Sequence, residues 1–581
     1  MSFDWINIKK NLNDLPNFVS SVIKQSEINI NKILKYDCVS ERDKFLKVLE
    51  KDTIEINKIY SLLNLMELIF NSNIIRDCLN LIGNYNYKIK TNGNLIKKLL
   101  YFNNLNSKDI QPYQKKFIEN IITQLKHNKN NITNKIFIEG IKYNNLNINI
   151  FNVDNFMIHL KKKERIELLH IYNNAIYNIL MSTLISRYNE AKYNYVDNYF
   201  MYKNKLNNKS FNNLKKFITD LIKTVNDQLS KKKDIINNKN YNYDNLIILE
   251  NSFDIKPISL KYFINKTIDF FKDKFQLNFQ TSNSLNKWSD NVIIYEVHKK
   301  DKKIGTLYLD LLKDQTSQKP KVPIFININN SHYNKILNIS EEAQTCIISS
   351  YDDYDSKILT FFKAQQLFVE FMLAIYNLFI HNNFGFSNIN IENNNIIEIL
   401  GEKIFQNETF IDNFYENTDE IEKKIEELQI IKLIKFRYLC LDSLFDIGIH
   451  LDNSITNCSQ NYIFDRTYQE IIKCYSIEKF NYSNINPKLL HKINGDFGGK
   501  YYHMIFNEII CHNISKIILN KNLGLELFTT LTSIENDFII NLKEYLTKYN
   551  LINKNMKFII KTSNNENTEI QTENQNFYKE I

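Results

Sequence analysis

Two glutamates in apolar, helix-forming stretches are the first candidates for chemistry. Glu370 lies in residues 367–373 and Glu398 in residues 397–402, and apolar side chains recur at helical spacing around both. A carboxylate can act as a general base towards water, and several carboxylates together can bind a divalent cation. Each glutamate taken alone is more typical of an ordinary surface carboxylate, so both need support from other residues.

A cluster of glycines beside aromatic residues is the second candidate. Three of the eleven glycines fall within five residues, in a chain of 581 residues that otherwise avoids glycine. Such clustering indicates backbone that takes a positive φ or approaches another group closely. A plain glycine turn between two helices stays open as the alternative. The residues concerned are His491, Gly495, Gly498, Gly499, Tyr501 and Tyr502.

The elements that must position these residues are mostly helices. Apolar residues recur at steps of three and four through most of the chain, as in residues 211–229. One region differs, because residues 292–297, 304–312 and 322–328 are β-rich runs and the last of them alternates. We therefore expect a mostly α fold, with a small antiparallel sheet before the helix that carries Glu370.

The charge of the chain gives little support for a nucleic-acid partner. The net charge is +9, from 74 basic and 65 acidic residues. The basic clusters are short and separate, at residues 161–163, 231–233 and 299–303. Binding to phosphates needs a contiguous basic face, whereas short clusters are typical of solvated helix faces and turns. We expect no nucleic acid among the partners.

Cysteine usage and hydropathy favour a cytoplasmic protein. The seven cysteines are odd in number, far apart and never in a C-x-x-C pair, which favours a reducing compartment. The longest apolar stretch, residues 367–380, contains Glu370 and is shorter than the ~20 residues of a membrane helix. The first residues lack the basic and apolar regions of a secretory signal. We expect no membrane partner.

Two further motifs occur in order around these elements. The first is matched by Gly305, Tyr308, Leu309, Asp310 and Leu311, and the second by Leu367, Phe368, Glu370 and Phe371. Together they resemble the M3 family of zinc oligopeptidases, the group of thimet oligopeptidase, oligopeptidase A and dipeptidyl carboxypeptidase. The family's motifs read G-x-x-Y-L-D-L in the sheet and L-F-H-E-F-G-H in the helix that follows.

Both zinc histidines of that family are replaced here by aliphatic residues. In H-E-x-x-H, two imidazoles four residues apart bind one zinc ion, and the glutamate is the general base towards zinc-bound water. The two positions are Val369 and Leu373, which cannot bind a metal. The third family ligand, a glutamate, corresponds to Glu398, 29 residues after Val369. The resemblance implies a vestigial metal site in which Glu398 survives.

The glycine cluster resembles the family's loop H-x-x-x-G-G-Y-x-x-x-Y-Y-x-Y, which contacts substrate. Phe497 and Met504 stand where two of its tyrosines would be. The resemblance implies catalytic roles for Glu370, His491 and Tyr501. It implies substrate-binding roles for Gly495, Gly498, Gly499 and Tyr502. Weaker matches are Trp288 and the stretch Leu444, Phe445 and Asp446 with His450.

The same resemblance implies a bilobed, zincin-like helical fold with a deep central cleft. It would comprise an N-terminal helical lobe (residues 1–150) and an M3 peptidase-like domain (residues 151–562). A polar tail (residues 563–581) is expected to be disordered. The implied ligands are short peptides, and the implied family reaction is zinc-dependent endopeptidase hydrolysis of oligopeptides.

Without zinc that reaction should be impaired or lost. Zinc-bound water has a pKa near 7 and bulk water 15.7, so proton transfer to a glutamate costs about 4 kcal/mol with zinc and about 15 without it. Mg²⁺ or Ca²⁺ held by Glu370, Glu398 and Glu402 could replace zinc, or His381 could supply a ligand. Three hypotheses stay open: an altered peptidase, a non-catalytic peptide-binding or scaffold protein, and a basic helical protein that binds nucleic acid.

Overall fold

The computed structural model divides by internal contacts into two units, and each is described by itself. The sheet unit comprises Met1–Asn128, Lys256–Phe410 and Ile514–Leu546, and the helical unit comprises Lys129–Ile255, Ile411–Asn513 and Thr547–Ile581. The structure describes residues 12–36, 41–70, 72–90, 92–103, 141–143, 146–148, 157, 160–204, 208–231, 253, 255–282, 287–313, 319–329, 331–334, 339–382, 391–415, 419–451, 460–475, 485, 487–495, 497–521, 523–532, 545–548, 558–561 and 567–570.

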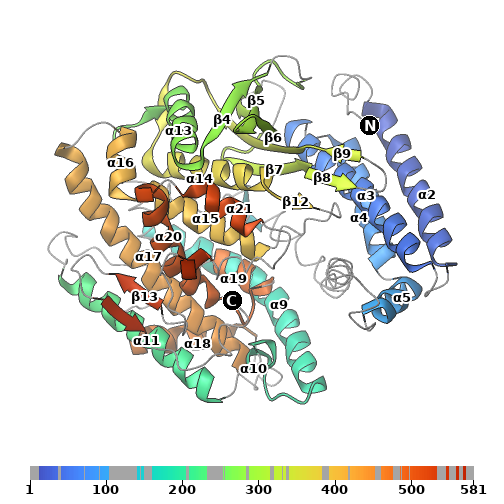
Figure 1. Ribbon diagram of the computed structural model, residues 1–581. Coiled ribbons are helices and arrows are strands. Elements are labelled where there is room, and N and C mark those ends of the chain that lie inside the picture. Colours follow the sequence, from blue (N-terminus) through green and yellow to red (C-terminus); the bar gives the residue numbers. More distant parts are fainter. Residues whose placement is uncertain are drawn as a thin grey trace. The chain divides into compact units, whose positions relative to one another are not determined.

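A five-stranded sheet forms the centre of the sheet unit (Figure 1), in the order β4-β5-β6-β10-β7. Its strands are β4 (Leu277–Thr281), β5 (Ile293–Lys299), β6 (Lys302–Leu312), β7 (Ile324–Asn329) and β10 (Ala343–Tyr351). The three predicted β-rich runs correspond to β5, β6 and β7. The sheet is mixed and not purely antiparallel, because β10 pairs with β6 in parallel. On its other side β10 pairs antiparallel with β7. The strand β10 therefore lies between β6 and β7 and runs in the same direction as β6.

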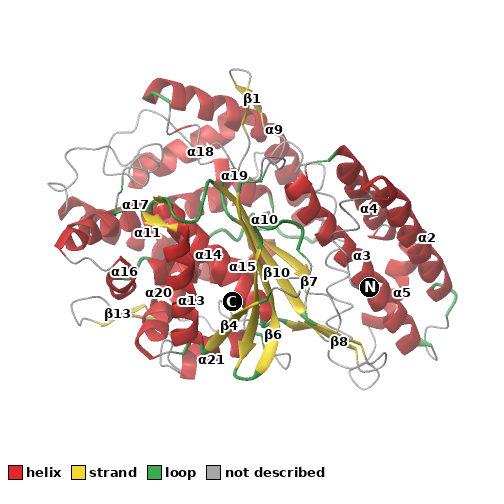
Figure 2. Ribbon diagram, turned by 90° about the horizontal axis from the view of Figure 1, so that it is seen from above, coloured by secondary structure: helices red, strands yellow, loops and turns green. Residues whose placement is uncertain are grey.

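Helices cover both faces of this sheet (Figures 1 and 2). On one face, side chains such as Tyr308, Cys346 and Ile348 pack into a core with α2 (Leu15–Ile33), α3 (Arg42–Phe70) and α4 (Asn73–Lys90). The other face lies against α14 (Phe361–Leu378), which contacts β6, β7 and β10. Strand positions therefore alternate between two apolar layers, as a sheet buried on both faces requires.

The helix α14 is apolar around most of its circumference because it is enclosed by protein. Phe368 packs against aromatic rings of α13 (Leu260–Phe275), α15 (Ile391–Phe405) and α16 (Glu408–Tyr415), with centroids 5.1 to 6.3 Å apart. Such ring pairs add packing energy beyond the buried area. In the part of the chain that the structure describes, no helix combines the length and apolarity needed to cross a membrane.

A buried ion pair ties β6 to the segment that follows it. The Lys319 Nζ lies 2.5 Å from Asp310 Oδ1, and both side chains are almost fully excluded from solvent. The indole N–H of Trp288 donates to the other oxygen, Asp310 Oδ2, at 2.8 Å, and its ring stacks on Tyr308. Both carboxylate oxygens are therefore paired, which a buried charge requires. The remaining elements of this unit are η1 (Leu12–Asp14), α5 (Gly93–Asn103), β3 (Ile258–Ser259), β8 (Ser331–Asn334), β9 (Ile339–Glu341), β11 (Lys357–Leu359), β12 (His381–Asn382) and α21 (Gly524–Leu531).

The helical unit is built from long helices. They are α9 (Lys162–Tyr193), α10 (Tyr199–Asn204), α11 (Asn208–Lys231), α17 (Asp419–Leu451), α18 (Gln460–Tyr475), α19 (Pro487–Asn494) and the first part of α20 (His503–Lys521). The predicted stripe on α11 is confirmed, because Leu214, Ile218 and Ile222 are buried and α11 packs on α17. The helix α9 packs on α18 and α19.

Short strands complete the described chain. The strands β1 (Ile141–Tyr143) and β2 (Leu146–Ile148) form one hairpin, and β13 (Phe558–Lys561) pairs antiparallel with β14 (Asn567–Ile570). The rest of the polar tail lies outside the described residues. Each of the two units consists of three separate stretches of the chain, so they do not test domain limits given as single ranges. The limits at residues 150 and 562 stay predictions.

Candidate functional site

Glu370 lies on α14 and binds the edge strand of the sheet. Its Oε2 accepts a hydrogen bond from the backbone N–H of Phe325 on β7, at 2.7 Å. Burial raises the pKa of Glu370 to about 8, and the charge of Glu398 on α15 raises it further, although the Phe325 N–H opposes the shift. The carboxyl group is therefore mostly protonated at neutral pH, and its hydrogen bond occupies a backbone donor of β7.

Val369 and Leu373, where the resemblance predicts the zinc histidines, are both buried on α14. Val369 and Leu373 are 9% and 4% exposed. A Cβ added to Gly401 of α15 would lie 3.3 Å from the Cα and Cγ2 of Val369 and from the Cγ of Met372. The glycine therefore allows α14 and α15 to approach closely, and the space between them is filled by apolar atoms.

These residues do not fit a zinc ion. Zinc in proteins is bound by imidazole nitrogen, thiolate sulfur or carboxylate oxygen, and neither Val369 nor Leu373 carries such an atom. Glu398 and Glu402 are half-buried on α15. Among the residues that the structure describes, no three His, Cys, Asp or Glu side chains form a group that could hold a metal ion.

The glycine loop, defined here as Gly495 and residues 497–502, lies between α19 and α20 in the helical unit. Gly499 has φ +77°, and a Cβ added to Gly498 would lie 2.0 Å from Arg187 Nη1. One glycine is thus required by backbone conformation and the other by close approach, as the clustering predicts. Gly495 is exposed.

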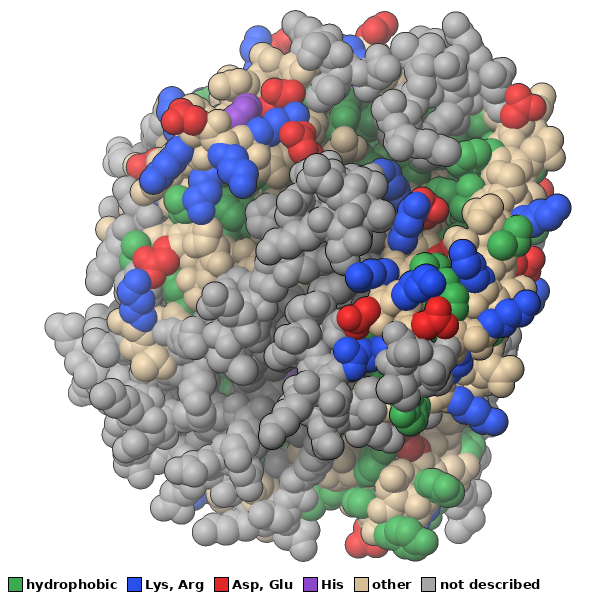
Figure 3. Space-filling model, turned by 45° about the vertical axis from the view of Figure 1, so that its right-hand side comes forward, with side chains coloured by type: hydrophobic (Ala, Val, Ile, Leu, Met, Phe, Trp, Pro, Cys, Tyr) green, Lys and Arg blue, Asp and Glu red, His purple; other side chains and the backbone are tan. Residues whose placement is uncertain are grey.

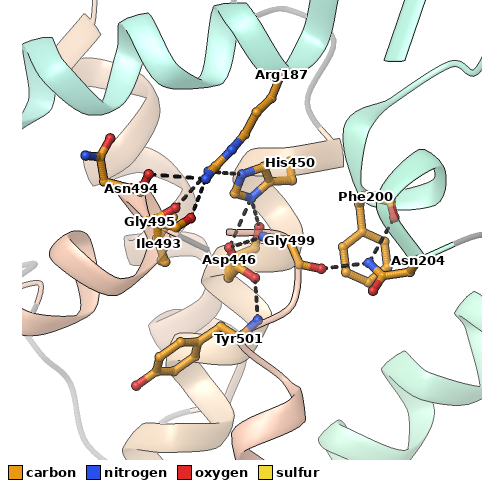
Figure 4. Close-up of polar contacts among 10 residues, drawn as sticks. All are labelled: Arg187, Phe200, Asn204, Asp446, His450, Ile493, Asn494, Gly495, Gly499 and Tyr501. Atoms are coloured by element: carbon orange, nitrogen blue, oxygen red, sulfur yellow. Dashed lines mark hydrogen bonds and ion pairs between the residues drawn. The ribbon is translucent and has the colours of Figure 1, made fainter. Parts of the chain in front are cut away.

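Arg187 of α9 binds the start of the loop (Figure 4). Its guanidinium donates to the carbonyl oxygens of Ile493, Asn494 and Gly495 at 2.7, 3.2 and 2.6 Å. Ile493 and Asn494 lie in the last turn of α19 and Gly495 follows it, where a helix leaves its acceptors unpaired and where a cation is favoured. Arg187 therefore caps the helix and fixes the entry of the loop.

Asp446 of α17 binds the other end of the loop. Its Oδ1 accepts from the Gly499 N–H at 2.9 Å, and its Oδ2 accepts from the Tyr501 N–H at 3.0 Å. The Nδ2 of Asn204 donates to the Gly499 carbonyl at 2.7 Å. Acceptors and donors of the loop backbone are thus satisfied by side chains of three helices, as buried backbone requires.

His450 links the two ends. Its Nε2 lies 3.0 Å from Arg187 Nη1, and its Nδ1 lies 2.8 Å from the Asp446 carbonyl and 3.0 Å from Asp446 Oδ1. A guanidinium has only donors, so Nε2 accepts and the ring proton is on Nδ1. Asp446 is fully buried, His450 is 3% exposed and Arg187 is 8% exposed.

Both tyrosines of the loop are buried. The Tyr502 hydroxyl donates a hydrogen bond to Asn204 Oδ1 at 3.0 Å, so its proton is already used in a contact that holds the loop. Burial, together with Asp442, Asp446 and Glu508, raises the pKa of Tyr501 well above its usual value, so its phenol keeps its proton. His491 lies on α19, and its side chain lies outside the described residues.

The predicted site residues therefore divide between the two units. Glu370 and Glu398 interact within the sheet unit, and the glycines and tyrosines share a network in the helical unit. Asp446 and His450 belong to this network although their sequence match was weak. Arg187 and Asn204 were missed. A signal for Arg187 does exist, because only six of the 74 basic residues are arginines.

Comparison with known proteins supports the fold. No family model and no curated protein matches the sequence. An X-ray structure assigned provisionally to oligoendopeptidase F superposes with a TM-score of 0.60 and 9% identity, over 90% of this chain and 92% of that one. Oligoendopeptidase F from Enterococcus faecium superposes with a TM-score of 0.50 and 10% identity, over 92% and 94%. The chain therefore has the mostly helical fold of oligoendopeptidase F, an M3 peptidase.

Proposed function

We propose that this protein binds short peptides and has lost the zinc centre of M3 oligopeptidases. The observation that carries the proposal is the contact between α14 and α15, where Val369, which the resemblance aligns with a zinc histidine, packs against Gly401. The hydrogen bond from Phe325 to Glu370 supports it, because a protonated carboxyl group cannot take a proton from water.

Two elements are offered as peptide contacts, one in each unit. The strand β7 is an edge strand, and an edge can pair with an extended peptide by strand addition, here at positions other than the Phe325 N–H that Glu370 already uses. The glycine loop is held in one conformation by Asp446, and Gly495 at its start is exposed, so we offer this exposed start as the second contact. From the dispersed cysteines of the sequence we also infer a cytoplasmic location.

The test combines peptide binding with hydrolysis. A fluorescein-labelled random octapeptide library is titrated with the full chain at pH 7, and cleavage is followed by mass spectrometry with Zn²⁺, Mn²⁺, Mg²⁺ or Ca²⁺ added. We expect binding without cleavage. We also expect Glu370→Gln to bind as the wild type does, because glutamine mimics the protonated carboxyl group. Absence of binding across the library overturns the proposal.

A second candidate is a peptidase that uses an oxygen-bound cation. The electrostatic interaction between Glu370 and Glu398 favours it, because Mg²⁺ and Ca²⁺ prefer carboxylate ligands. Cleavage that requires one of these ions and is lost in Glu370→Gln establishes this function instead. Glu426→Gln, an exposed position on α17, is the control and should leave cleavage unchanged.

A further inference from the structure

We propose that Arg187, His450 and Asp446 form a positioning relay that holds the glycine loop in its peptide-binding conformation. The inference rests on the proposed function, since that function makes the loop a peptide contact. The three side chains come from α9 and α17 and form one continuous chain of hydrogen bonds from the start of the loop to its end (Figure 4).

The arginine end of the relay needs a guanidinium. Arg187 reaches three successive carbonyl oxygens, those of Ile493, Asn494 and Gly495, and also the Nε2 of His450. A guanidinium offers five donors in a planar fork, whereas a lysine ammonium offers three donors at one point. Lysine keeps the charge at this position but cannot reach acceptors on two sides.

The aspartate end needs a carboxylate. Asp446 accepts two backbone N–H groups, those of Gly499 and Tyr501, on different oxygens. Hydrogen bonds to an ionised acceptor are about twice as strong as neutral ones. The bond to the Tyr501 N–H fixes the backbone at the first of two adjacent tyrosines, so Asp446 positions both Tyr501 and Tyr502.

His450 transmits orientation between the two charged groups. Its Nε2 must accept from Arg187 while its Nδ1–H donates to Asp446, so only one tautomer satisfies both neighbours. The ring of Tyr199, from α10, lies 5.4 Å away and packs beside it. Two substitutions of His450 separate its two contacts. His450→Asn retains a donor near Asp446, and His450→Gln retains an acceptor near Arg187.

The closing experiment measures loop order independently of peptide binding. Hydrogen exchange of the Gly499 and Tyr501 amides is measured in the full chain by mass spectrometry of overlapping fragments. We expect Arg187→Lys to speed this exchange by about tenfold or more, because hydrogen bonds to a charged group are lost. The same variant should weaken peptide binding by a similar factor. Arg165→Lys is the matched control, since Arg165 is an equally buried arginine on α9, and it should leave both readouts unchanged.

A second measurement covers the case in which Arg187→Lys does not fold. Nitrogen NMR of ¹⁵N-histidine-labelled protein should show His450 with its proton on Nδ1, and His450→Asn and His450→Gln should each speed exchange. Unchanged exchange in Arg187→Lys, or in both histidine variants, overturns the relay. A wild type that binds no peptide overturns the proposed function alone, because the exchange results still decide the relay.

Discussion

Glu370 makes a contact that conflicts with the role implied by the M3 resemblance. Its Oε2 is held by the Phe325 N–H, and its pKa of about 8 leaves it mostly protonated at pH 7. A general base must be ionised and free to accept a proton, whereas the Glu370 carboxyl group is mostly protonated and already bonded to the Phe325 N–H. Glu370, to which the resemblance assigns the role of general base, is therefore a neutral hydrogen-bond partner of an edge strand.

Restoring both imidazoles tests whether the alignment of residues 369 to 398 is correct. We expect Val369→His/Leu373→His to bind about one Zn²⁺ per chain, because two histidines four apart on one helix face and Glu398 complete a three-ligand set. Metal content is measured by elemental analysis after dialysis. Adding Glu398→Gln to the pair should lower the zinc content. A folded double variant with no more zinc than the wild type contradicts the alignment.

Arg187 shows why part of the site escaped prediction. Its partners are backbone carbonyls about 300 residues away in sequence. Every residue type has a backbone carbonyl, so such partners cannot be recognised from the sequence. The glycines could be singled out because their conformation and crowding exclude side chains. Asp446 and His450 could be singled out only weakly, since four-residue spacing on a helix has many causes.

At the scale of elements, the pairing of α14 with α15 depends on one small residue. A Cβ at Gly401 would lie 3.3 Å from atoms of Val369 and Met372, closer than ordinary van der Waals contact, so a larger side chain must push the helices apart. The helices bury most of their facing side chains, and separation would open space in a tightly packed layer.

A leucine at this position should therefore destabilise the protein. We expect Gly401→Leu to lower the free energy of unfolding by about 1 to 3 kcal/mol, because overpacking forces side chains and backbone to shift. Gly83→Leu on α4 is the control, since nothing lies within 4 Å of its Cβ position and leucine is the better helix former. Urea unfolding of both variants gives the comparison. Equal effects at the two glycines would show that the α14–α15 contact is not tight.

The strand β10 shows the limit of periodicity. The runs that became β5, β6 and β7 contain β-branched residues, so they could be predicted. Residues 343–351 include buried Thr345 and Ser349 and show no alternation of polar and apolar types. A central strand is buried on both faces, so its side chains need not alternate between polar and apolar, and backbone hydrogen bonds to its neighbours hold it in place. The expectation of a purely antiparallel sheet was wrong because β10, which pairs in parallel with β6, is not among the predicted runs.

At the scale of the whole molecule, the described charges bear on a nucleic-acid partner. On the face drawn in Figure 3, acidic side chains lie among the lysines and arginines. Arg76 pairs with Glu67 at 2.9 Å, and Lys88 pairs with Glu27 at 2.8 Å. Such pairs use basic groups that a phosphate backbone would otherwise neutralise. Nucleic-acid binding gains no support from this face.

Stability should fall between pH 6.5 and pH 8. Burial raises the pKa of Glu370 and of Asp442 to about 8, so the folded chain holds two protons that the unfolded chain releases. Each group then lowers the free energy of unfolding by up to about 1.4 kcal/mol per pH unit. Burial lowers the pKa of His503 to about 3, an effect of opposite sign that ends near pH 6.5.

The check uses neutral mimics of both acids. Glu370→Gln/Asp442→Asn should remove this slope, so its stability relative to the wild type should rise by up to about 4 kcal/mol from pH 6.5 to pH 8. Urea unfolding at three pH values in this range measures the difference. Parallel curves for the two proteins would mean that neither acid is protonated in the folded state.

The stack of Trp288 on Tyr308, with its indole bonded to Asp310, has a spectroscopic consequence. Trp288 lies in the sheet unit, and the other tryptophan of the chain, Trp5, can be replaced by phenylalanine. Emission of Trp5→Phe, excited where tryptophan but not tyrosine absorbs, therefore follows the sheet unit, while far-ultraviolet circular dichroism follows the helices of both units. Transitions that coincide in the two signals mean that the units melt together, and transitions that separate give each unit its own melting curve.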